Sequence, residues 1–263
     1  MKTRVLVLGS SGMLGSMVLD YLSEKDLEIT APSREQLATT PYEFYDYIIN
    51  CIGITKQKLN DAEEAILINS SFPYHLRKLA PKATIIQIAT DCVYSGVKGN
   101  YLEYDKHDAS DIYGKTKSLG EVTDDKFYNI RCSIIGFDKD NVSLLSWFLS
   151  QKEVDGFVNH YWNGITTLHF AKLCYAIISE NRVLPNILHF IPKDSISKLY
   201  LLKLISKIFK KNIIVNRVET DKVHRTLSTN YRKLNDLLWL DMGYLYVPTV
   251  EAMIEELYEY NKE

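Results

Sequence analysis

The chain has 263 residues, of which 46% are hydrophobic and 24% are charged, and its formal net charge is −2. This length allows one large domain or a main domain with a smaller lobe, and the composition is that of an ordinary globular protein. The near-neutral charge argues against a nucleic-acid or membrane-surface binder. The four cysteines show no CxxC spacing, so we expect reduced thiols and no metal site. The sequence shows neither a signal-peptide pattern nor an apolar run of membrane-spanning length, so we expect a cytoplasmic protein.

The first half of the chain alternates short apolar strands with helical patterns. Strands are predicted at residues 5–8, 27–30, 47–52, 84–89 and 128–131, and helices at residues 13–23, 63–79 and 110–122. This alternation predicts βαβ units and a parallel sheet. We therefore expect an α/β fold in which residues 1–135 form a Rossmann-type, doubly wound NADP-binding domain.

The alternation loosens after about residue 135. Helices are predicted there at residues 144–149, 168–178, 197–209 and 250–258, strands at residues 187–191 and 213–218, and a loop at residues 155–166. No linker or change of composition separates this part from the first. We expect residues 136–263 to form mainly a small α/β substrate lobe that is packed on the first domain or interleaved with it.

A glycine-rich loop, Gly9-Ser10-Ser11-Gly12-Met13-Leu14-Gly15, joins the first predicted strand to the first predicted helix. Gly9 allows a tight turn, Gly12 lets the backbone approach a pyrophosphate, and Gly15 lets the helix pack closely on the sheet. The helix N-terminus adds N–H donors and a favourable dipole. The loop predicts a nicotinamide dinucleotide site formed by Gly9, Ser11, Gly12, Met13, Leu14 and Gly15. The alternative is a plain turn in an unrelated α/β fold.

The residues after the second predicted strand bear on the type of cofactor. An acidic residue at this point would suit the ribose 2′-hydroxyl of NAD, whereas the chain has Ser33 and Arg34. A hydroxyl and a guanidinium can together bind a 2′-phosphate, which favours NADP(H) over NAD(H). The alternative is that Arg34 is an ordinary surface residue.

Tyr113 and Lys117 are four residues apart on a predicted helix and therefore share one of its faces. A nearby ammonium stabilises a phenolate, which is how a tyrosine becomes useful in acid–base chemistry near neutral pH. Thr90 directly follows a predicted strand, at the sheet edge where ligands bind in doubly wound folds. Thr90, Tyr113 and Lys117 together form a plausible site for carbonyl reduction, although a Tyr-x-x-x-Lys spacing alone also fits a solvated helix face.

These motifs together resemble the dTDP-4-dehydrorhamnose reductase-like branch of the extended short-chain dehydrogenase/reductase family. That branch has a similar glycine loop, a Thr-Asp-aromatic-Val-aromatic-x-Gly stretch like residues 90–96, and a Tyr-Gly-x-x-Lys-x-x-Gly-Glu stretch like residues 113–121. The resemblance implies NADP-dependent reduction of a keto group, expected at C4, on a nucleotide-linked deoxysugar in surface polysaccharide or deoxysugar biosynthesis. It implies that Tyr113 donates the proton, that Lys117 lowers the pKa of Tyr113 and anchors the ribose, and that Thr90 binds the carbonyl oxygen.

The resemblance also implies further contacts. Cofactor contacts are implied for Cys51, Ile52, Gly53 and Asn69, besides Tyr113 and Lys117. Substrate contacts are expected from Thr90, Asp91, Cys92, Tyr94, Ile134, Trp162 and Asn163, with simple aromatic packing as the alternative for the loop that holds Trp162. Cys92 replaces a family aromatic and Ile134 a family tryptophan, and these departures bear on the identity of the sugar more than on the chemistry.

Two other functions remain open from the sequence. One is an epimerase or dehydratase on the same scaffold that retains NAD, and the other is a non-catalytic regulatory subunit. The length of the chain and its small C-terminal lobe favour the reductase over the first. The joint presence of Thr90, Tyr113 and Lys117 argues against the second. The expected partner is a nucleotide sugar, without nucleic acid or membrane, and a homodimer is compatible with the sequence.

Overall fold

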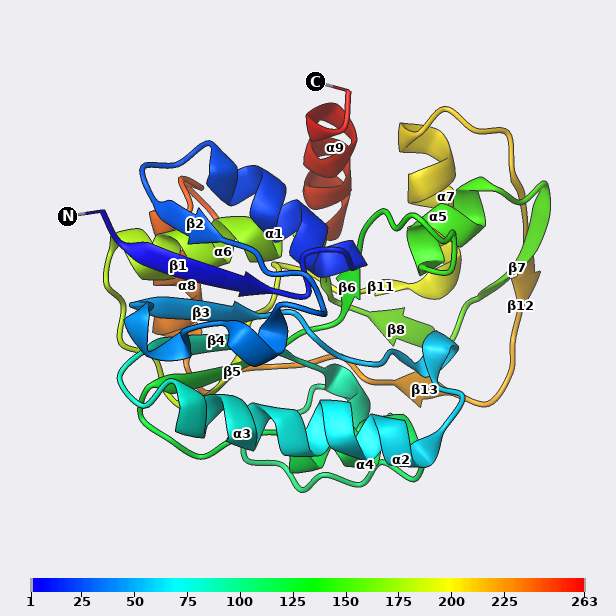
Figure 1. Cartoon of the computed structure of the whole chain (residues 1–263). Coiled ribbons are helices and arrows are strands. Elements are labelled where there is room, and N and C mark those ends of the chain that lie inside the picture. The colour runs from blue at the N-terminus through cyan, green and yellow to red at the C-terminus, as the bar shows by residue number, and fades with distance from the viewer. Residues whose placement is uncertain (1, 263) are drawn as a thin grey trace.

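Six parallel strands form the central sheet, in the order β2-β1-β3-β4-β5-β10 (Figure 1). The strands are β1 (Arg4–Leu8), β2 (Glu28–Thr30), β3 (Tyr47–Asn50), β4 (Thr84–Ala89), β5 (Phe127–Arg131) and β10 (Ile187–His189). This computed structural model describes residues 2–262. Because β1 pairs with β2 on one side and β3 on the other, the winding reverses at β1, where such folds bind ligands. The predicted doubly wound α/β fold is confirmed.

Alternate residues of the strands face the two sides of the sheet. In β1, Val5 and Val7 belong to one buried apolar cluster, whereas Leu6 and Leu8 belong to a second. The same alternation separates Ile49 from Ile48 in β3 and continues through β4 and β5. Both faces are apolar because helices cover both, as expected for a parallel sheet.

Helices pack on both faces of the sheet (Figure 1). On one face lie α1 (Met13–Ser23), α6 (Thr167–Ser179) and α8 (Arg232–Asp241). On the other lie α2 (Ala62–Ala65), α3 (Phe72–Leu79) and α4 (Ile112–Leu119). A π-helical turn, Ile66–Ser71, joins α2 to α3, so the predicted helix at residues 63–79 is continuous but irregular.

The remaining elements lie beside the sheet, at its carboxyl edge (Figure 1). They are β6 (Ile134–Ile135), α5 (Leu144–Leu149), β7 (Glu153–Phe157), β8 (His160–Trp162), β9 (Ile165–Thr166), β11 (Ile196–Ser197), α7 (Lys198–Ile208), β12 (Ile214–Val218), β13 (Val223–His224) and α9 (Val250–Tyr260). The strands among them form three small sheets: β11-β8-β13, β12-β7 and β6-β9. Residues after 135 therefore both build this lobe and supply β10 and α6 to the central sheet and its cover.

Two predictions about secondary structure were wrong, and one helix was missed. The expected loop at residues 155–166 contains β8, β9 and most of β7, because this segment pairs with β12, β11, β13 and β6. The helix predicted at residues 110–122 is shorter, since it ends where Gly120 packs against the backbone of Asn69. Helix α8 was not expected, although Leu234 and Leu238 have helical spacing.

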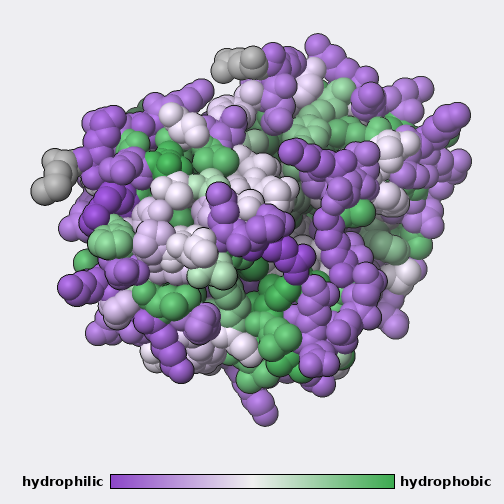
Figure 2. All heavy atoms as spheres, viewed as in Figure 1, coloured by the Kyte–Doolittle hydropathy of each residue, from purple (hydrophilic) through white to green (hydrophobic). Residues whose placement is uncertain are grey.

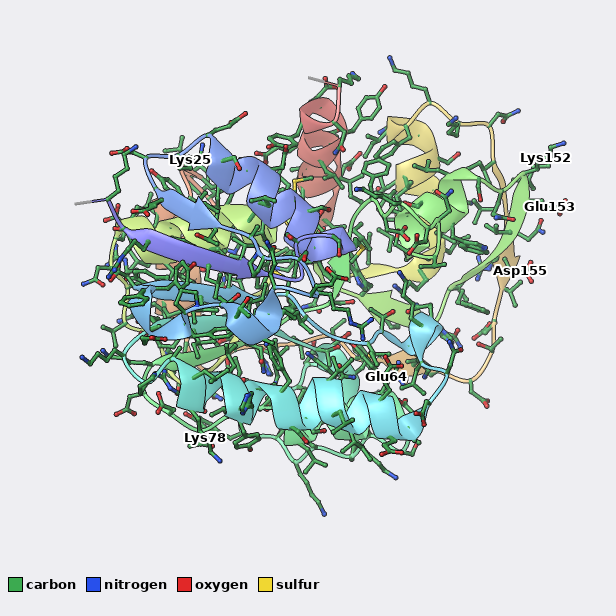
Figure 3. The ribbon with its side chains drawn as sticks, in the orientation of Figure 1. Lys25, Glu64, Lys78, Lys152, Glu153 and Asp155 are labelled. Atoms are coloured by element: carbon green, nitrogen blue, oxygen red, sulfur yellow. The ribbon has the colours of Figure 1, made fainter. Side chains whose placement is uncertain are left out.

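The outer surface of the molecule is mostly polar. Figure 3 shows Lys78 and Lys152, which are both exposed, pointing away from the ribbon. Figure 2 shows hydrophilic residues over most of one face, with apolar residues gathered near α2 and the π-helical turn, where Ile66 and Leu67 are exposed. Among residues 2–262, none of the helices combines the length and the apolar character needed to cross a membrane.

Candidate active site

The glycine loop turns the chain sharply from β1 into α1. Gly9 has a φ of +78°, a backbone conformation that residues with a side chain rarely adopt. A Cβ atom on Gly15 would lie 2.1 Å from the carbonyl oxygen of Gly9, so only glycine allows α1 to start so close to the strand. Gly12 is the N-cap residue of α1 and offers no side-chain cap, and the first turn carries no acidic residue. The N-terminal N–H groups of α1 are therefore suited to bind an anionic group.

Within the glycine loop the predicted cofactor residues differ in exposure. Ser11 and Gly12 are exposed and Met13 is half-buried, so these three are accessible to a ligand. Leu14 instead packs in the buried core, as Gly15 does at the start of the helix. Backbone atoms, rather than the Leu14 side chain, are what this part of the loop can offer to a cofactor.

A second part of the candidate cofactor site follows β3. The Asn69 side chain accepts a hydrogen bond from the Ile54 N–H (2.9 Å) and donates to the Ile54 carbonyl (3.1 Å) and to Thr116 (3.3 Å). Asn69 lies in the π-helical turn and so ties the Cys51–Ile54 loop to α4. A Cβ atom on Gly53 would lie 3.4 Å from Asn69 Oδ1 and 3.9 Å from Lys117 Nζ. Three predicted cofactor residues, Gly53, Asn69 and Lys117, are thus close together.

The three predicted catalytic residues come together where β4 ends. Thr90 directly follows β4 and caps the short turn at residues 91–93, accepting a hydrogen bond from the Cys92 N–H (3.1 Å). Asp111 caps the N-terminus of α4, and its side chain accepts a hydrogen bond from the Gly114 N–H (2.9 Å). A Cβ atom on Gly114 would lie 2.3 Å from the Cys92 carbonyl oxygen, so α4 packs directly on this turn. This close packing puts Tyr113 beside Thr90, near enough for the hydroxyl to affect the tyrosine pKa.

Burial dominates the electrostatics of Tyr113. Burial raises the pKa of Tyr113, and the nearby Thr90 hydroxyl opposes this only in part. Lys117 is not among the main groups that act on this pKa, so its lowering of the Tyr113 pKa stays a prediction. Lys117 Nζ instead donates to the Ile88 carbonyl (2.9 Å), and burial lowers the pKa of Lys117 itself to about 8. At neutral pH Tyr113 keeps its proton, as a proton donor must.

The predicted substrate residues occupy different environments. Asp91 and Cys92 are half-buried beside Thr90, and Ile134 is half-buried in β6. The Tyr94 ring is completely buried and stacks on Tyr101 with centroids 4.1 Å apart, so it offers no surface to a ligand. Trp162 is buried and donates to the Ser133 hydroxyl (2.8 Å).

Asn163 uses its side-chain amide within the protein. It accepts from the Leu227 N–H (3.0 Å) and donates to the Leu227 carbonyl (2.7 Å). Together with buried Trp162, this arrangement matches the aromatic-packing alternative for the loop. Neither Tyr94 nor Asn163 is part of the substrate contacts that we propose below.

Two cations near Asp91 were missed by sequence reasoning. Lys198 begins α7, and its Nζ lies 5.4 Å from the centroid of the Trp162 ring. Burial lowers the pKa of Lys198 to about 8, although Asp91 acts in the opposite direction. Arg225 also acts on the pKa of Asp91, which burial raises. No ion pair joins Asp91, Lys198 and Arg225 within residues 2–262. No motif or spacing could have linked residues so far apart in the chain.

Residues 3–211 match the model of the family described as the RmlD substrate binding domain. The chain belongs to this family. The resemblance inferred from the glycine loop and the Tyr113–Lys117 motif is therefore confirmed. The spore coat polysaccharide biosynthesis protein SpsK of Bacillus subtilis is 31% identical over 134 residues, which are 45% of this chain and 47% of SpsK. The matched segment thus spans about half the length of that curated relative.

Solved structures of similar proteins share the whole architecture. The dTDP-4-dehydrorhamnose reductase of Bacillus anthracis, solved in complex with NADP, is 19% identical with a TM-score of 0.82, over 99% of this chain and 100% of that one. A dTDP-4-dehydrorhamnose reductase of Clostridium acetobutylicum is also 19% identical, with a TM-score of 0.81 and the same coverage. At such identities the likeness establishes the fold.

Proposed function

We propose that this chain reduces a keto group, at C4, on a nucleotide-linked deoxysugar, using NADPH, in surface polysaccharide or deoxysugar biosynthesis. The observation that carries the proposal is the meeting of Thr90 and Tyr113 at the end of β4, with Lys117 beside the loop after β3. Family membership and the names of the similar proteins support the same chemistry.

The residues around the glycine loop fit a nicotinamide dinucleotide. Helix α1 presents N–H groups without a side-chain cap, and a Cβ atom on Gly12 would meet only the Gly9 carbonyl oxygen, at 3.4 Å. The backbone there can approach a pyrophosphate closely. Asn69, Gly53 and Lys117 would hold the nicotinamide half.

Each catalytic side chain has a distinct role in the proposed reaction. The bound nicotinamide supplies hydride to the carbonyl carbon. The Thr90 hydroxyl donates a hydrogen bond to the carbonyl oxygen and holds it next to Tyr113. The Tyr113 hydroxyl, kept protonated by burial, donates its proton to that oxygen. Lys117, as an ammonium, stabilises the phenolate that this leaves behind and anchors the ribose.

We propose NADP(H) in preference to NAD(H). Ser33 and Arg34 follow β2, and the Arg34 side chain is 81% exposed, with a distant ion pair to Glu64 (3.8 Å). The Ser33 hydroxyl donates to Glu35 (2.7 Å). Since an exposed ion pair contributes little free energy, Arg34 can leave Glu64 and bind a 2′-phosphate.

Lys198 and Arg225 suit the charge of a nucleotide diphosphate. Both act electrostatically on Asp91, and neither forms an ion pair within the described part of the chain, residues 2–262. Two cations and one carboxylate together give a net positive charge beside Thr90 and Cys92. We propose that these cations bind the diphosphate, with Asp91, Cys92 and Ile134 near the sugar.

We also propose that the two parts of the chain have the separate binding roles expected from the sequence. Residues 1–135 would hold the cofactor and residues 136–263 would mainly bind the substrate, apart from β10, α6 and α8, which belong to the central sheet and its cover. A homodimer and a cytoplasmic location complete the proposal.

A screen of NADPH oxidation tests this function. Purified protein should oxidise NADPH with at least one dTDP-, UDP- or GDP-linked 4-keto-6-deoxysugar. Tyr113→Phe should lower kcat by roughly a hundredfold or more while the dissociation constant for NADPH stays unchanged. Tight NADPH binding without turnover of any substrate would contradict the proposal and favour the regulatory alternative.

A further inference from the structure

One segment of the chain, residues 225–230, lies between two parts of the candidate site; we call it the strap. On one side, the Ser228 N–H donates to the Tyr101 carbonyl (2.7 Å) and the Tyr101 N–H donates to the strap at Thr226 (3.0 Å). On the other side, Leu227 exchanges two hydrogen bonds with the Asn163 side chain. The strap thus links the segment after Thr90 to the loop that contains Trp162.

The strap also positions one of the two cations of the site. Arg225 Nε donates to the Tyr94 carbonyl (2.9 Å), and the aliphatic part of Arg225 packs over Gly96. Because Tyr94 and Gly96 follow the Thr90–Cys92 turn, the guanidinium is fixed relative to that turn. A displaced strap would move Arg225 and the Trp162 loop together.

A single buried carboxylate anchors the end of the strap. Glu103 is 2% exposed, and its Oε1 accepts from the Thr229 hydroxyl (2.5 Å) and the His189 N–H (3.1 Å). Its Oε2 accepts from the Asn230 N–H (2.9 Å) and side-chain amide (3.1 Å). Burial alone would raise the pKa of Glu103, but these hydrogen bonds outweigh it and lower the pKa, so the carboxylate is ionised.

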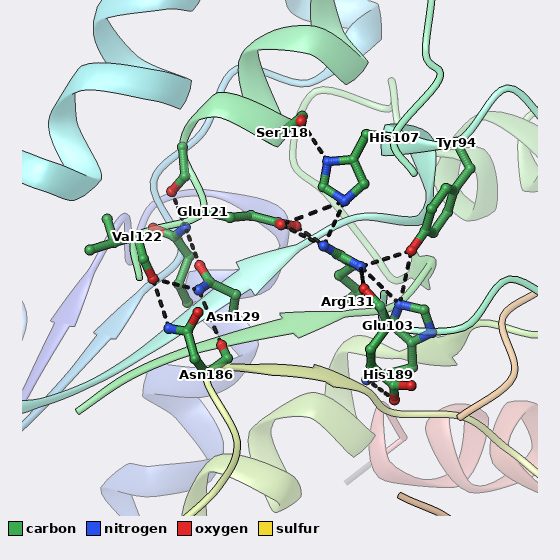
Figure 4. Close-up of polar contacts among 12 residues, drawn as sticks. Tyr94, Glu103, His107, Ser118, Glu121, Val122, Asn129, Arg131, Asn186 and His189 are labelled. Atoms are coloured by element: carbon green, nitrogen blue, oxygen red, sulfur yellow. Dashed lines mark hydrogen bonds and ion pairs between the residues drawn. The ribbon is translucent and has the colours of Figure 1, made fainter. Parts of the chain in front are cut away.

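Arg131 connects Glu103 to α4, the helix that carries Tyr113 and Lys117 (Figure 4). Its guanidinium is buried and donates to the Glu103 carbonyl (2.9 Å), to the Tyr94 hydroxyl (2.8 Å) and to both oxygens of Glu121 (2.7 and 2.6 Å). Glu121 lies just after α4, the helix that carries Tyr113 and Lys117. Arg131 therefore links the end of α4 to the backbone of Glu103, whose carboxylate in turn holds the end of the strap.

Stability alone is a poor explanation for this network. Desolvating a guanidinium and two carboxylates costs several kcal/mol per ion, and well-packed apolar residues often replace such groups without loss of stability. What a fully hydrogen-bonded ionic network can provide is one unique geometry. The elements held here are those that carry the proposed catalytic and substrate-binding residues.

We propose that Glu103 is a positioning residue that, with Arg131, holds the strap at a fixed position relative to Thr90 and α4, and so sets the affinity for the nucleotide sugar. This inference rests on the proposed function, because that function assigns Arg225 to the diphosphate of the substrate. The cofactor side is joined to α4 through Asn69 and does not depend on the strap.

The test is Glu103→Gln, which keeps the size of the side chain but turns an amide N–H₂ toward donors of Asn230 or Thr229. We expect KM for the sugar nucleotide to rise roughly tenfold to a hundredfold, because a displaced Arg225 would lose its charged hydrogen bond to the diphosphate. The dissociation constant for NADPH should not change. A purely structural role would not separate these two constants.

Two further variants distinguish a positioning role of Glu103 from a general loss of stability. Asp241→Asn weakens the partly exposed ion pair with Arg182 (2.8 Å), away from the strap, and should lower the melting temperature without raising KM. Asn230→Ala removes only one hydrogen bond to Glu103 from an exposed residue, so it should fold and raise KM by a smaller factor. Unchanged KM in both Glu103→Gln and Asn230→Ala, or a loss of NADPH affinity in either, would overturn the inference.

Failure of the proposed function gives a different result. If the wild-type protein oxidises NADPH with none of the nucleotide sugars, its affinity for dTDP, UDP and GDP can still be measured by calorimetry. Weaker binding of these nucleotides to Glu103→Gln, but not to Asp241→Asn, supports the positioning role independently of turnover. Equal binding to both variants and to the wild type contradicts it.

Discussion

Lys117 is a buried ammonium whose proton is held less tightly than that of an exposed lysine. Burial outweighs the attraction of Glu121 and lowers its pKa from 10.5 to about 8. Since the folded-state pKa is lowered, the cationic form prevails below about pH 8 and is lost as the pH rises through that value. The proposed reduction requires the cation, and Tyr113 remains protonated throughout this range because burial raises its pKa.

A pH profile tests this role of Lys117. In the wild type, kcat/KM should fall as the pH rises above about 8, since this parameter reports the ionisation of the free enzyme. Lys117→Arg should move the fall to higher pH, because a guanidinium stays protonated. Exposed Lys115 lies on the same helix, and Lys115→Arg should leave the profile unchanged. A wild-type profile that stays flat up to pH 9.5 would contradict the assignment.

Arg34 is the residue on which cofactor preference should depend. Arg34→Ala should raise KM for NADPH by roughly tenfold to a hundredfold, as expected for a lost charged hydrogen bond of about 1.5–3 kcal/mol. KM for NADH should stay the same, because NADH has no 2′-phosphate. Glu64→Ala serves as a control for the ion pair. Equal changes with both cofactors would show that Arg34 does not distinguish them.

At the scale of the elements, the start of α4 depends on Gly114. A side chain there would collide with the Cys92 carbonyl at 2.3 Å and with Ala109 Cβ at 2.5 Å. Gly114→Ala must therefore push α4 away from the turn that carries Thr90. We expect it to destabilise the protein by about 1–3 kcal/mol and to lower kcat more than it weakens NADPH binding.

The matched control for this variant is Leu119→Ala, at an exposed position of the same helix. Both variants would be compared by denaturant unfolding and steady-state kinetics. If Gly114→Ala keeps the wild-type kcat, then close contact between α4 and the Thr90 turn is not required for the reaction.

Much of the sheet and its helices could be predicted because local patterns determine them. The apolar run in β1, the glycine loop and the helical spacing in α1 all lie within the first 23 residues. The strands of the lobe were harder to predict. In β7, exposed Glu153 and Asp155 alternate with buried Val154 and Gly156, yet only pairing with the distant β12 makes this short stretch a strand.

In the candidate active site, too, local features could be predicted and contacts between distant segments could not. The Tyr113–Lys117 spacing and the position of Thr90 after a strand are local features, so the sequence was sufficient to propose them. Lys198 and Arg225 reach the site through α7 and the strap, which are remote in sequence. The pKa of Tyr113 depends on burial, and spacing alone carries no information about burial.

At the scale of the whole molecule, the two halves of the chain share one sheet. Helix α6 packs against α1, and β10 pairs with β5. A fragment of residues 1–135 would expose both the apolar face of α1 and the edge of β5. We expect this fragment alone to lack a cooperative thermal transition, whereas co-expression with residues 136–263 should yield a soluble complex. Circular dichroism and limited proteolysis would measure this, and a cooperative transition of the fragment alone would show that it folds by itself.

The late position of β10 in the chain also affects how the protein is made. At roughly 5–20 residues per second, a ribosome releases β5 seconds before β10 becomes available. During that interval the N–H and C=O groups along β5 can pair with another nascent chain. The newly synthesised chain is therefore prone to pair with other chains until β10 has been made. The rate of translation through residues 136–189 sets the length of this interval.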